Sequence, residues 1–160
     1  MSSIETDIRP ELFVVNMEAS CAEEALEGLA ELLRRQGFVR DSFAEAVKER
    51  ERLYSTGLAF PEMGIAIPHA QAEHVISPAL AVGILKNTVE FRHMGMPEVP
   101  VETRIVFMLA VRDEEEQPEY LAGLLDVFQA EGSLMRLAAC QSPEEAADCL
   151  RELLQTVCRK

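Results

Sequence analysis

The chain has 160 residues, of which 48% are hydrophobic and 27% charged, and its formal net charge is -13. The length is that of one ordinary domain with one core, and no apolar run approaches the ~20 residues that a membrane-spanning helix needs. The acidic balance and the lack of a Lys/Arg-rich run argue against a nucleic-acid-binding surface, which needs clustered basic residues, and favour basic proteins as partners.

The first ten residues have neither the basic start nor the apolar segment of a secretory signal. We therefore expect a flexible lead-in over residues 1–10, a single domain over residues 11–160, and a cytoplasmic location.

The cysteines contain no C-x-x-C pair and mostly fall at apolar helical positions, which favours free, buried thiols over a redox or metal role. They are Cys21, Cys140, Cys149 and Cys158.

A short strand at residues 12–15 opens the pattern of expected elements. Ser20 followed by Glu23 is typical of a capping box, and a helix is expected from there to Gly37, which suits a C-terminal cap. The next helix begins at Asp41 or Ser42.

One face of this second helix carries Phe43, Val47, Arg50 and Tyr54, at helical spacing. Arg50 is therefore predicted to lie on the side that faces the protein. Residues 55–64 are rich in turn formers and are expected to form a loop.

Residues 64–67 (GIAI) are expected to form a buried strand, and Pro68 then removes a backbone donor. His69 is thereby predicted to lie at the end of a strand.

Further strands are expected at residues 79–85, 89–91 and 104–111, with Asn87-Thr88 as a hairpin turn between the first two. The acidic run 113–116 is expected to be a solvated loop.

Three helices are expected after it: one that begins at Pro118 and ends near Gly132, a short one at residues 134–140, and a terminal one capped by Ser142. The sequence therefore predicts an α/β fold, a single-domain layered sandwich in which a mixed four- to five-stranded sheet is flanked by helices.

The sequence has no phosphate-binding P-loop, no dinucleotide fingerprint, and no common zinc-protease or serine-hydrolase signature. No cofactor is expected. His69 and His74, with Glu73, are conceivable as metal ligands, but their spacing fixes no geometry and no third ligand is visible, so no metal site is predicted.

An imidazole is a nucleophile near neutral pH and can carry a covalent intermediate, which suits phosphoryl transfer. An arginine such as Arg50 can hold two phosphoryl oxygens in a fixed fork. From physical chemistry alone a structural histidine at position 69 stays open as the alternative.

The run from Arg50 to Gly57 (RERLYSTG), followed by Gly64 to His69 (GIAIPH), resembles the R-E-x-x-x-x-T-G and A-I-P-H motifs of mannitol/fructose-type enzyme IIA domains of the bacterial phosphotransferase system. The similarity spans roughly residues 12–154. The segment from Ala66 to His74 looks closest to the galactitol-specific members.

The resemblance implies a phosphotransferase component that is phosphorylated on His69 by the phosphocarrier protein HPr and donates to a cysteine of enzyme IIB, which works with the membrane enzyme IIC. Arg50 and His74 would act at the phosphoryl group, with Thr56 and Gln117 supporting it. Gln117 matches the place of a second histidine that mannitol-type members often carry, and it cannot titrate near neutral pH, so the second histidine's role is absent here or falls to His74.

The function implied is uptake of an alditol such as galactitol. The alternative is a regulatory protein of the same fold, in which phosphorylation of His69 changes which partner binds. An interaction domain with a vestigial histidine is disfavoured because Arg50, Thr56 and His69 occur together.

Overall fold

The computed structural model describes residues 7–111 and 117–157, without the side chains of residues 117–120 and 157. Within these residues a five-stranded sheet has the order β1-β4-β5-β3-β2. The strands are β1 (Phe13–Met17), β2 (Gly57–Ala59), β3 (Gly64–Ala66), β4 (Ala79–Arg92) and β5 (Pro100–Ala110). The helices are α1 (Ala22–Arg35), α2 (Phe43–Leu53), α3 (Gln117–Gln129), α4 (Ser133–Ala138) and α5 (Pro143–Val157), with two 3-10 turns, η2 (Pro10–Leu12) and η3 (Ala72–His74).

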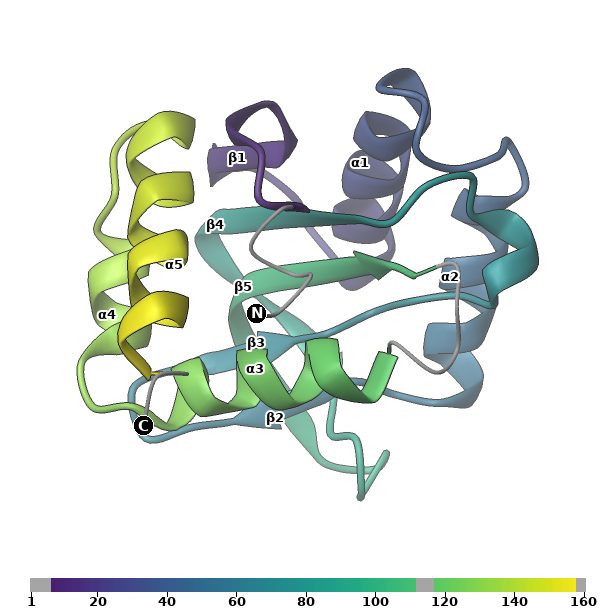
Figure 1. The fold of residues 1–160 in the computed structure, drawn as a ribbon. Coiled ribbons are helices and arrows are strands. Elements are labelled where there is room, and N and C mark those ends of the chain that lie inside the picture. Colours follow the sequence, from purple (N-terminus) through teal and green to yellow (C-terminus); the bar gives the residue numbers. More distant parts are fainter. Residues whose placement is uncertain (1–6, 112–116, 158–160) are drawn as a thin grey trace.

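Helices cover both faces of the sheet, with α1 and α2 on one side and α3, α4 and α5 on the other (Figure 1). Alternation along β5 explains the two layers, because side chains of successive strand residues point to opposite faces. Ile105 and Phe107 join the core beneath α3 to α5, whereas Val106 and Met108 join the core beneath α1 and α2. The predicted α/β layered sandwich with a mixed sheet is confirmed.

The predicted turn at Asn87-Thr88 is wrong. β4 continues through these residues to Arg92, and its register against β5 shifts between Ile84 and Val89. An irregularity in the ladder thus accommodates the polar pair, whose side chains are exposed. The chain reverses instead over residues 93–99, so β4 and β5 pair antiparallel through a longer connection than the predicted turn.

Residues 55–64, expected to be a loop, contain the short strand β2, which pairs antiparallel with β3. Gly57 makes this possible because a Cβ at that position would lie 2.6 Å from the backbone oxygen of Arg92. A close backbone approach of this kind admits only glycine. The sequence shows a turn former at position 57, and the packing shows an edge strand.

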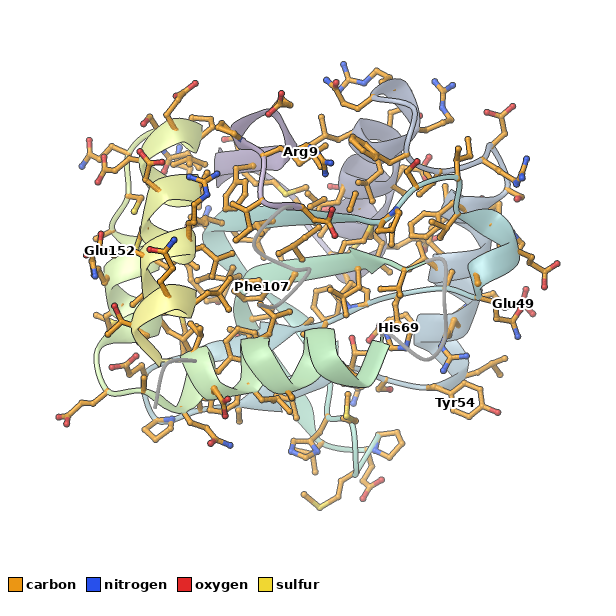
Figure 2. The ribbon with its side chains drawn as sticks, in the orientation of Figure 1. Arg9, Glu49, Tyr54, His69, Phe107 and Glu152 are labelled. Atoms are coloured by element: carbon orange, nitrogen blue, oxygen red, sulfur yellow. The ribbon has the colours of Figure 1, made fainter. Side chains whose placement is uncertain are left out.

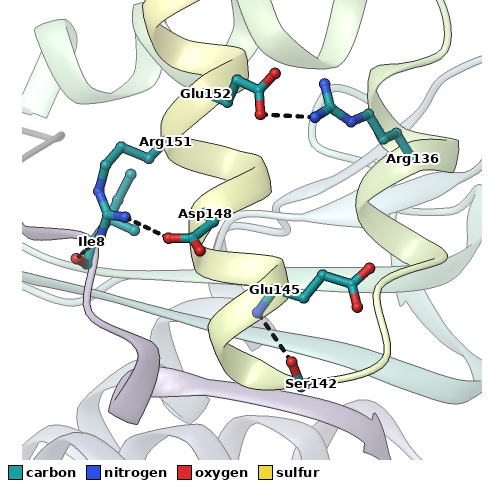
Figure 3. Close-up of polar contacts among 7 residues, drawn as sticks. All are labelled: Ile8, Arg136, Ser142, Glu145, Asp148, Arg151 and Glu152. Atoms are coloured by element: carbon teal, nitrogen blue, oxygen red, sulfur yellow. Dashed lines mark hydrogen bonds and ion pairs between the residues drawn. The ribbon is translucent and has the colours of Figure 1, made fainter.

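The caps of the helices follow the sequence in part. Gly37 ends α1 with φ of +87°, as expected. The predicted pairing of Ser20 with Glu23 is wrong, because the amide of Ser20 donates to Glu24 at 2.9 Å. At α5 the predicted cap is confirmed, since the amide of Glu145 donates to the Ser142 hydroxyl at 3.1 Å (Figure 3).

The flexible lead-in was expected to extend to residue 10, but the chain is already packed against the domain from residue 7. Asp7 and Ile8 are buried, and Arg151 of α5 donates to the backbone oxygen of Ile8 at 2.9 Å (Figure 3). A buried isoleucine that contacts the terminal helix belongs to the core. Residues 1–6 lie outside the described part of the chain.

No helix within the described residues is long and apolar enough to cross a membrane.

The thiols of Cys21, Cys140 and Cys149 are free, as predicted, and Cys158 lies outside the described residues. The expectation that all are buried is wrong for Cys21, which is exposed. Burial raises the pKa of Cys140 to about 12. Since the thiolate is the reactive form, Cys140 should react slowly in the native protein.

We therefore predict that a thiol reagent modifies Cys21 before Cys140 and Cys149, and that all four cysteines react after unfolding without reductant. Timed modification followed by peptide mass spectrometry measures both. Recovery of an internal disulfide from the unfolded protein would contradict the prediction.

Candidate functional site

His69 follows β3 directly and lies where β3 and β5 run side by side. Its backbone forms a parallel bridge with Leu109 of β5, and the amide of Leu109 donates to the carbonyl of Pro68 at 3.0 Å. Pro68 has no N–H to donate, but its carbonyl continues the pairing. His69 therefore lies at a strand end, as predicted, and its backbone is held against β5, the central strand of the sheet.

The His69 ring is held in one tautomer. Its Nδ1 lies 3.0 Å from the backbone oxygen of Ile67. A carbonyl oxygen only accepts hydrogen bonds, so Nδ1 carries the proton and Nε2 keeps its lone pair. Burial lowers the pKa of His69, and the positive charge of Arg50 lowers it further. The ring is therefore neutral at neutral pH, with Nε2 available as a nucleophile.

Arg50 projects from the last turns of α2 and has an unsatisfied donor. Its Nε is buried, and no hydrogen-bond partner for it exists among the described residues. The guanidinium carbon lies 5.1 Å from the centre of the Tyr54 ring, within cation–π range. A buried donor without a partner is costly, so this guanidinium is suited to receive an anion that the free protein does not supply.

Arg50 and His74 line one open groove of about 450 Å³ between α2 and η3. Leu53 and Tyr54 form part of its rim, and their side chains are 66% and 64% exposed. Figure 2 shows Tyr54 and His69 on the same side of the molecule. Exposed apolar side chains around a cation are typical of a surface that binds another protein.

His74 is oriented by Ser42. The Ser42 hydroxyl lies 2.8 Å from Nδ1 of His74, and the backbone oxygen of His74 accepts from the amide of Arg40 at 2.9 Å. Ser42 precedes α2 but makes no side-chain bond to the helix, so the residue expected as a possible cap serves His74. Within the described part of the chain, no hydrogen bond joins His74 to the ring of His69.

Thr56 supports the site through the backbone. Its amide and its hydroxyl both donate to the Glu51 carboxylate, each at 2.8 Å, and its carbonyl accepts from the amide of Ile67 at 3.3 Å. The hydroxyl that the resemblance placed at the phosphoryl group is engaged with Glu51 instead. Glu51 was missed as a site residue, although it is the glutamate of the R-E-x-x-x-x-T-G run.

Burial raises the pKa of Glu51 to about 7, against the hydrogen bonds from Thr56, which lower it. Below pH 4.5 the carboxyl is protonated in both the folded and the unfolded chain. Between pH 4.5 and 7 only the unfolded chain loses the proton, so the free energy of unfolding falls as pH rises, by up to about 3 kcal/mol.

We predict that Glu51→Gln removes this part of the pH dependence. Urea unfolding of both proteins at pH 5 and pH 8 measures it, and the quantity compared is the difference between the two pH values. The hydrogen bond that the variant loses affects stability at both pH values and so drops out of this difference. The titration of His69, which makes the free energy of unfolding rise with pH, occurs in both proteins and also drops out. Equal differences in the two proteins would contradict the raised pKa.

Gln117 begins α3, and its side chain lies outside the described residues. Among the described residues, no group of three or more potential metal-ligating side chains occurs, so His69 and His74 have no third ligand there.

A family model matches residues 8–153, and its description is "Phosphoenolpyruvate-dependent sugar phosphotransferase system, EIIA 2". The match covers every site residue named above.

The curated relatives carry names that refer to different sugars and to different roles. The fructose-specific EIIABC component of Bacillus subtilis is 29% identical over 86% of this chain, and the transcriptional regulator ManR of the same organism is 34% identical over 67%. The chain spans only 21% and 15% of those proteins. The galactitol-specific EIIA component of Escherichia coli is 28% identical over 66% of this chain and 70% of its own length.

Solved structures share the fold. A putative PTS IIA from Streptococcus mutans has a TM-score of 0.80 at 21% identity, covering 98% of this chain and 97% of its own. The mannitol enzyme IIA of Escherichia coli, solved in complex with phosphorylated enzyme IIB, has a TM-score of 0.72 at 24% identity, covering 89% and 95%.

Proposed function

This chain belongs to the EIIA 2 family of the phosphoenolpyruvate-dependent sugar phosphotransferase system, and on that premise we propose that it accepts a phosphoryl group on Nε2 of His69. Members of this family are phosphotransferase components that work through a phosphohistidine, so the chain is one as well. The identity of the phosphorylated residue, of the protein that donates the phosphoryl group and of the protein that accepts it is our proposal.

The observation that supports it most is the pairing of a neutral, single-tautomer imidazole with a nearby unpaired guanidinium. Nδ1 of His69 is occupied by the Ile67 carbonyl, which leaves Nε2 to attack phosphorus. Nε of Arg50 is buried without a partner. Phosphoryl transfer needs an in-line nucleophile and a cation at the equatorial oxygens, and little further covalent chemistry.

We propose HPr as the donor and a cysteine of enzyme IIB as the acceptor, with the membrane enzyme IIC downstream. The mannitol enzyme IIA that shares this fold was solved with phosphorylated enzyme IIB, which supports the second partner. The acidic net charge of -13 and the exposed Leu53 and Tyr54 beside Arg50 suit a protein docking surface.

Sugar uptake is the system's activity, and an alditol such as galactitol is the finer proposal. It rests on the run from Ala66 to His74. The fructose and galactitol relatives differ by one percentage point, at 29% and 28% identity, so the identities support a sugar or alditol without preferring one.

A second candidate is a regulatory role, favoured by the 34% identity with the transcriptional regulator. There, phosphorylation of His69 would add about two negative charges beside Arg50 and change which protein binds. In either role we place the chain in the cytoplasm, where reducing conditions keep thiols such as Cys140 and Cys149 free.

The test is a transfer experiment. The purified chain is incubated with phosphorylated HPr and then with candidate enzyme IIB domains, and the radiolabelled phosphate is followed from protein to protein. Label that reaches His69 and then enzyme IIB supports the carrier. Label that reaches His69 and stays there, with altered binding of another protein, supports the regulator. No label from HPr would contradict both.

A further inference from the structure

Glu51 directly follows Arg50 in α2, and its side chain bonds to the chain just beyond the end of that helix. One carboxylate oxygen accepts from the amide of Thr56 and the other accepts from the Thr56 hydroxyl, each at 2.8 Å. Thr56 is only 3% exposed. Two short bonds from one buried residue to both oxygens of a carboxylate fix the loop against the end of the helix.

Thr56 in turn holds the strand end that carries His69. Its carbonyl accepts from the amide of Ile67 at 3.3 Å, which extends the pairing of β2 with β3 by one residue. The carbonyl of Ile67 is the acceptor for Nδ1 of His69, at 3.0 Å. Hydrogen bonds therefore connect Glu51 to the imidazole through two intervening residues.

The strand end is held from both of its edges. On the β5 edge, the amide of Leu109 donates to the carbonyl of Pro68 at 3.0 Å, and on the β2 edge Thr56 accepts from Ile67. A displacement of Thr56 would leave the β5 edge in place and tilt the strand end about it. The tilt would change the direction of the Ile67 carbonyl and, with it, the direction of the His69 ring.

The placement of Arg50 depends on the same carboxylate. Phe43 and Val47 are buried and fix the first half of α2, whereas Leu53 at its end is 66% exposed. Apolar burial therefore anchors the start of this helix better than its end. Consecutive helical residues move together, so the bonds of Glu51 to the loop also restrain the backbone of Arg50.

We infer that Glu51 is a positioning residue for phosphoryl transfer: through Thr56 it sets where the Arg50 guanidinium lies relative to Nε2 of His69. The inference rests on the proposed function of His69. Both oxygens of Glu51 already accept from Thr56, and a carboxylate repels phosphoryl oxygens, so Glu51 acts through its neighbours. A misplacement of about 1 Å between reacting groups costs up to about 10²-fold in rate.

The test compares variants that keep one or neither of the bonds to Thr56, at pH 8, above the raised pKa of Glu51 of about 7. Glu51→Gln and Thr56→Val each keep the bond from the amide, and Glu51→Leu keeps neither. The maximal rate of labelling by phosphorylated HPr should fall about three- to tenfold in each one-bond variant and about 10²-fold in Glu51→Leu. Thr56→Ser, which restores the hydroxyl, should recover the rate lost in Thr56→Val.

Two further features separate positioning from binding. The HPr concentration that gives half the maximal rate should not change, because neither Glu51 nor Thr56 lines the groove that holds Arg50. The double variant Glu51→Gln/Thr56→Val should be no slower than either single variant, since all three lose the same hydroxyl bond.

Glu62→Gln is the matched control. Glu62 also accepts two hydrogen bonds, from the amides of Gly132 and Met135 at 2.6 and 3.4 Å, but it precedes β3, whereas His69 follows it. This variant should be labelled at the rate of the unchanged chain.

A second readout, which does not involve phosphoryl transfer, is ¹⁵N NMR of the imidazole rings. Glu51→Leu should shift the ring signals of His69 from those of a single Nδ1–H tautomer, whereas Glu62→Gln should leave them in place. Urea unfolding reports the stability of each variant. If Glu51→Leu fails to fold, the two one-bond variants decide by the same criteria.

The inference is overturned if the folded Glu51 variants are labelled at the unchanged rate, or if Glu62→Gln slows labelling as much as Glu51→Gln does. Failure of the proposed function looks different, because the unchanged chain would then take no label from HPr. In that case the ring signals alone decide whether Glu51 positions His69, and unshifted signals in Glu51→Leu would refute it.

Discussion

Replacing His69 by Gln should abolish phosphorylation of the chain by HPr. Glutamine keeps the polarity and approximate length of the side chain but has no nitrogen lone pair that can attack phosphorus. The loss should therefore be complete rather than partial. The measurement is the amount of acid-labile, alkali-stable label on the protein, which is the signature of a phosphoramidate.

His74→Gln is the matched control. His74 shares a groove with Arg50 and is oriented by Ser42, so we expect it to shape the surroundings of the phosphoryl group. The variant should still accept label, with an altered rate or lifetime. Label that survives in His69→Gln and disappears in His74→Gln would overturn the assignment of both residues.

The second large effect is expected for Arg50→Lys. The variant keeps the positive charge, but it loses the planar fork and the buried Nε that has no partner in the free protein. Removing one preorganised donor from a transition state typically slows a reaction about 10²- to 10³-fold. We expect a fall of that order in transfer from His69 to enzyme IIB.

The fold should persist in Arg50→Lys, because the guanidinium makes no ion pair or hydrogen bond to a described residue and contacts the Tyr54 ring through cation–π attraction. Unfolding by urea checks this. Arg52→Gln, which changes the next arginine on the other face of α2, is the control for loss of charge nearby. Unaltered transfer in Arg50→Lys would refute the role of Arg50.

Sequence patterns predicted those elements whose signals are local. Apolar periodicity located the helices, Ser142 and Glu145 located the start of α5, and Pro68 located His69 at a strand end. Each of these signals depends on neighbours within four residues, so the tertiary structure had little opportunity to override it.

The elements that could not be predicted depend on contacts between distant segments. β2 exists because Gly57 approaches Arg92, 35 positions further along the chain, and β4 runs through Asn87 because β5 continues to pair with it. Ser42 bonds to His74 rather than capping its own helix. No rule of spacing within the sequence reports such contacts.

The site residues divide in the same way. The resemblance pointed to Arg50 and His69, and our proposal for both rests on the unpaired Nε of Arg50 and the contact of His69 Nδ1 with the Ile67 oxygen. It named Thr56 without revealing that the hydroxyl belongs to Glu51. The buried Glu51 carboxyl, which accepts two hydrogen bonds from Thr56, links α2 to the loop that follows it. The sequence alone does not indicate that this carboxyl is buried.

The order of the strands also sets the order in which they can come together. β4 and β5 are neighbours in the chain and pair through a connection of seven residues, whereas β1 reaches β4 only across residues 18–78. Closing a long loop costs more conformational entropy than closing a short one. We therefore expect the β4–β5 hairpin to nucleate folding, with β1 added late. Because β3 pairs with β5 rather than with β1, His69 would reach its place in the sheet without waiting for the amino-terminal edge.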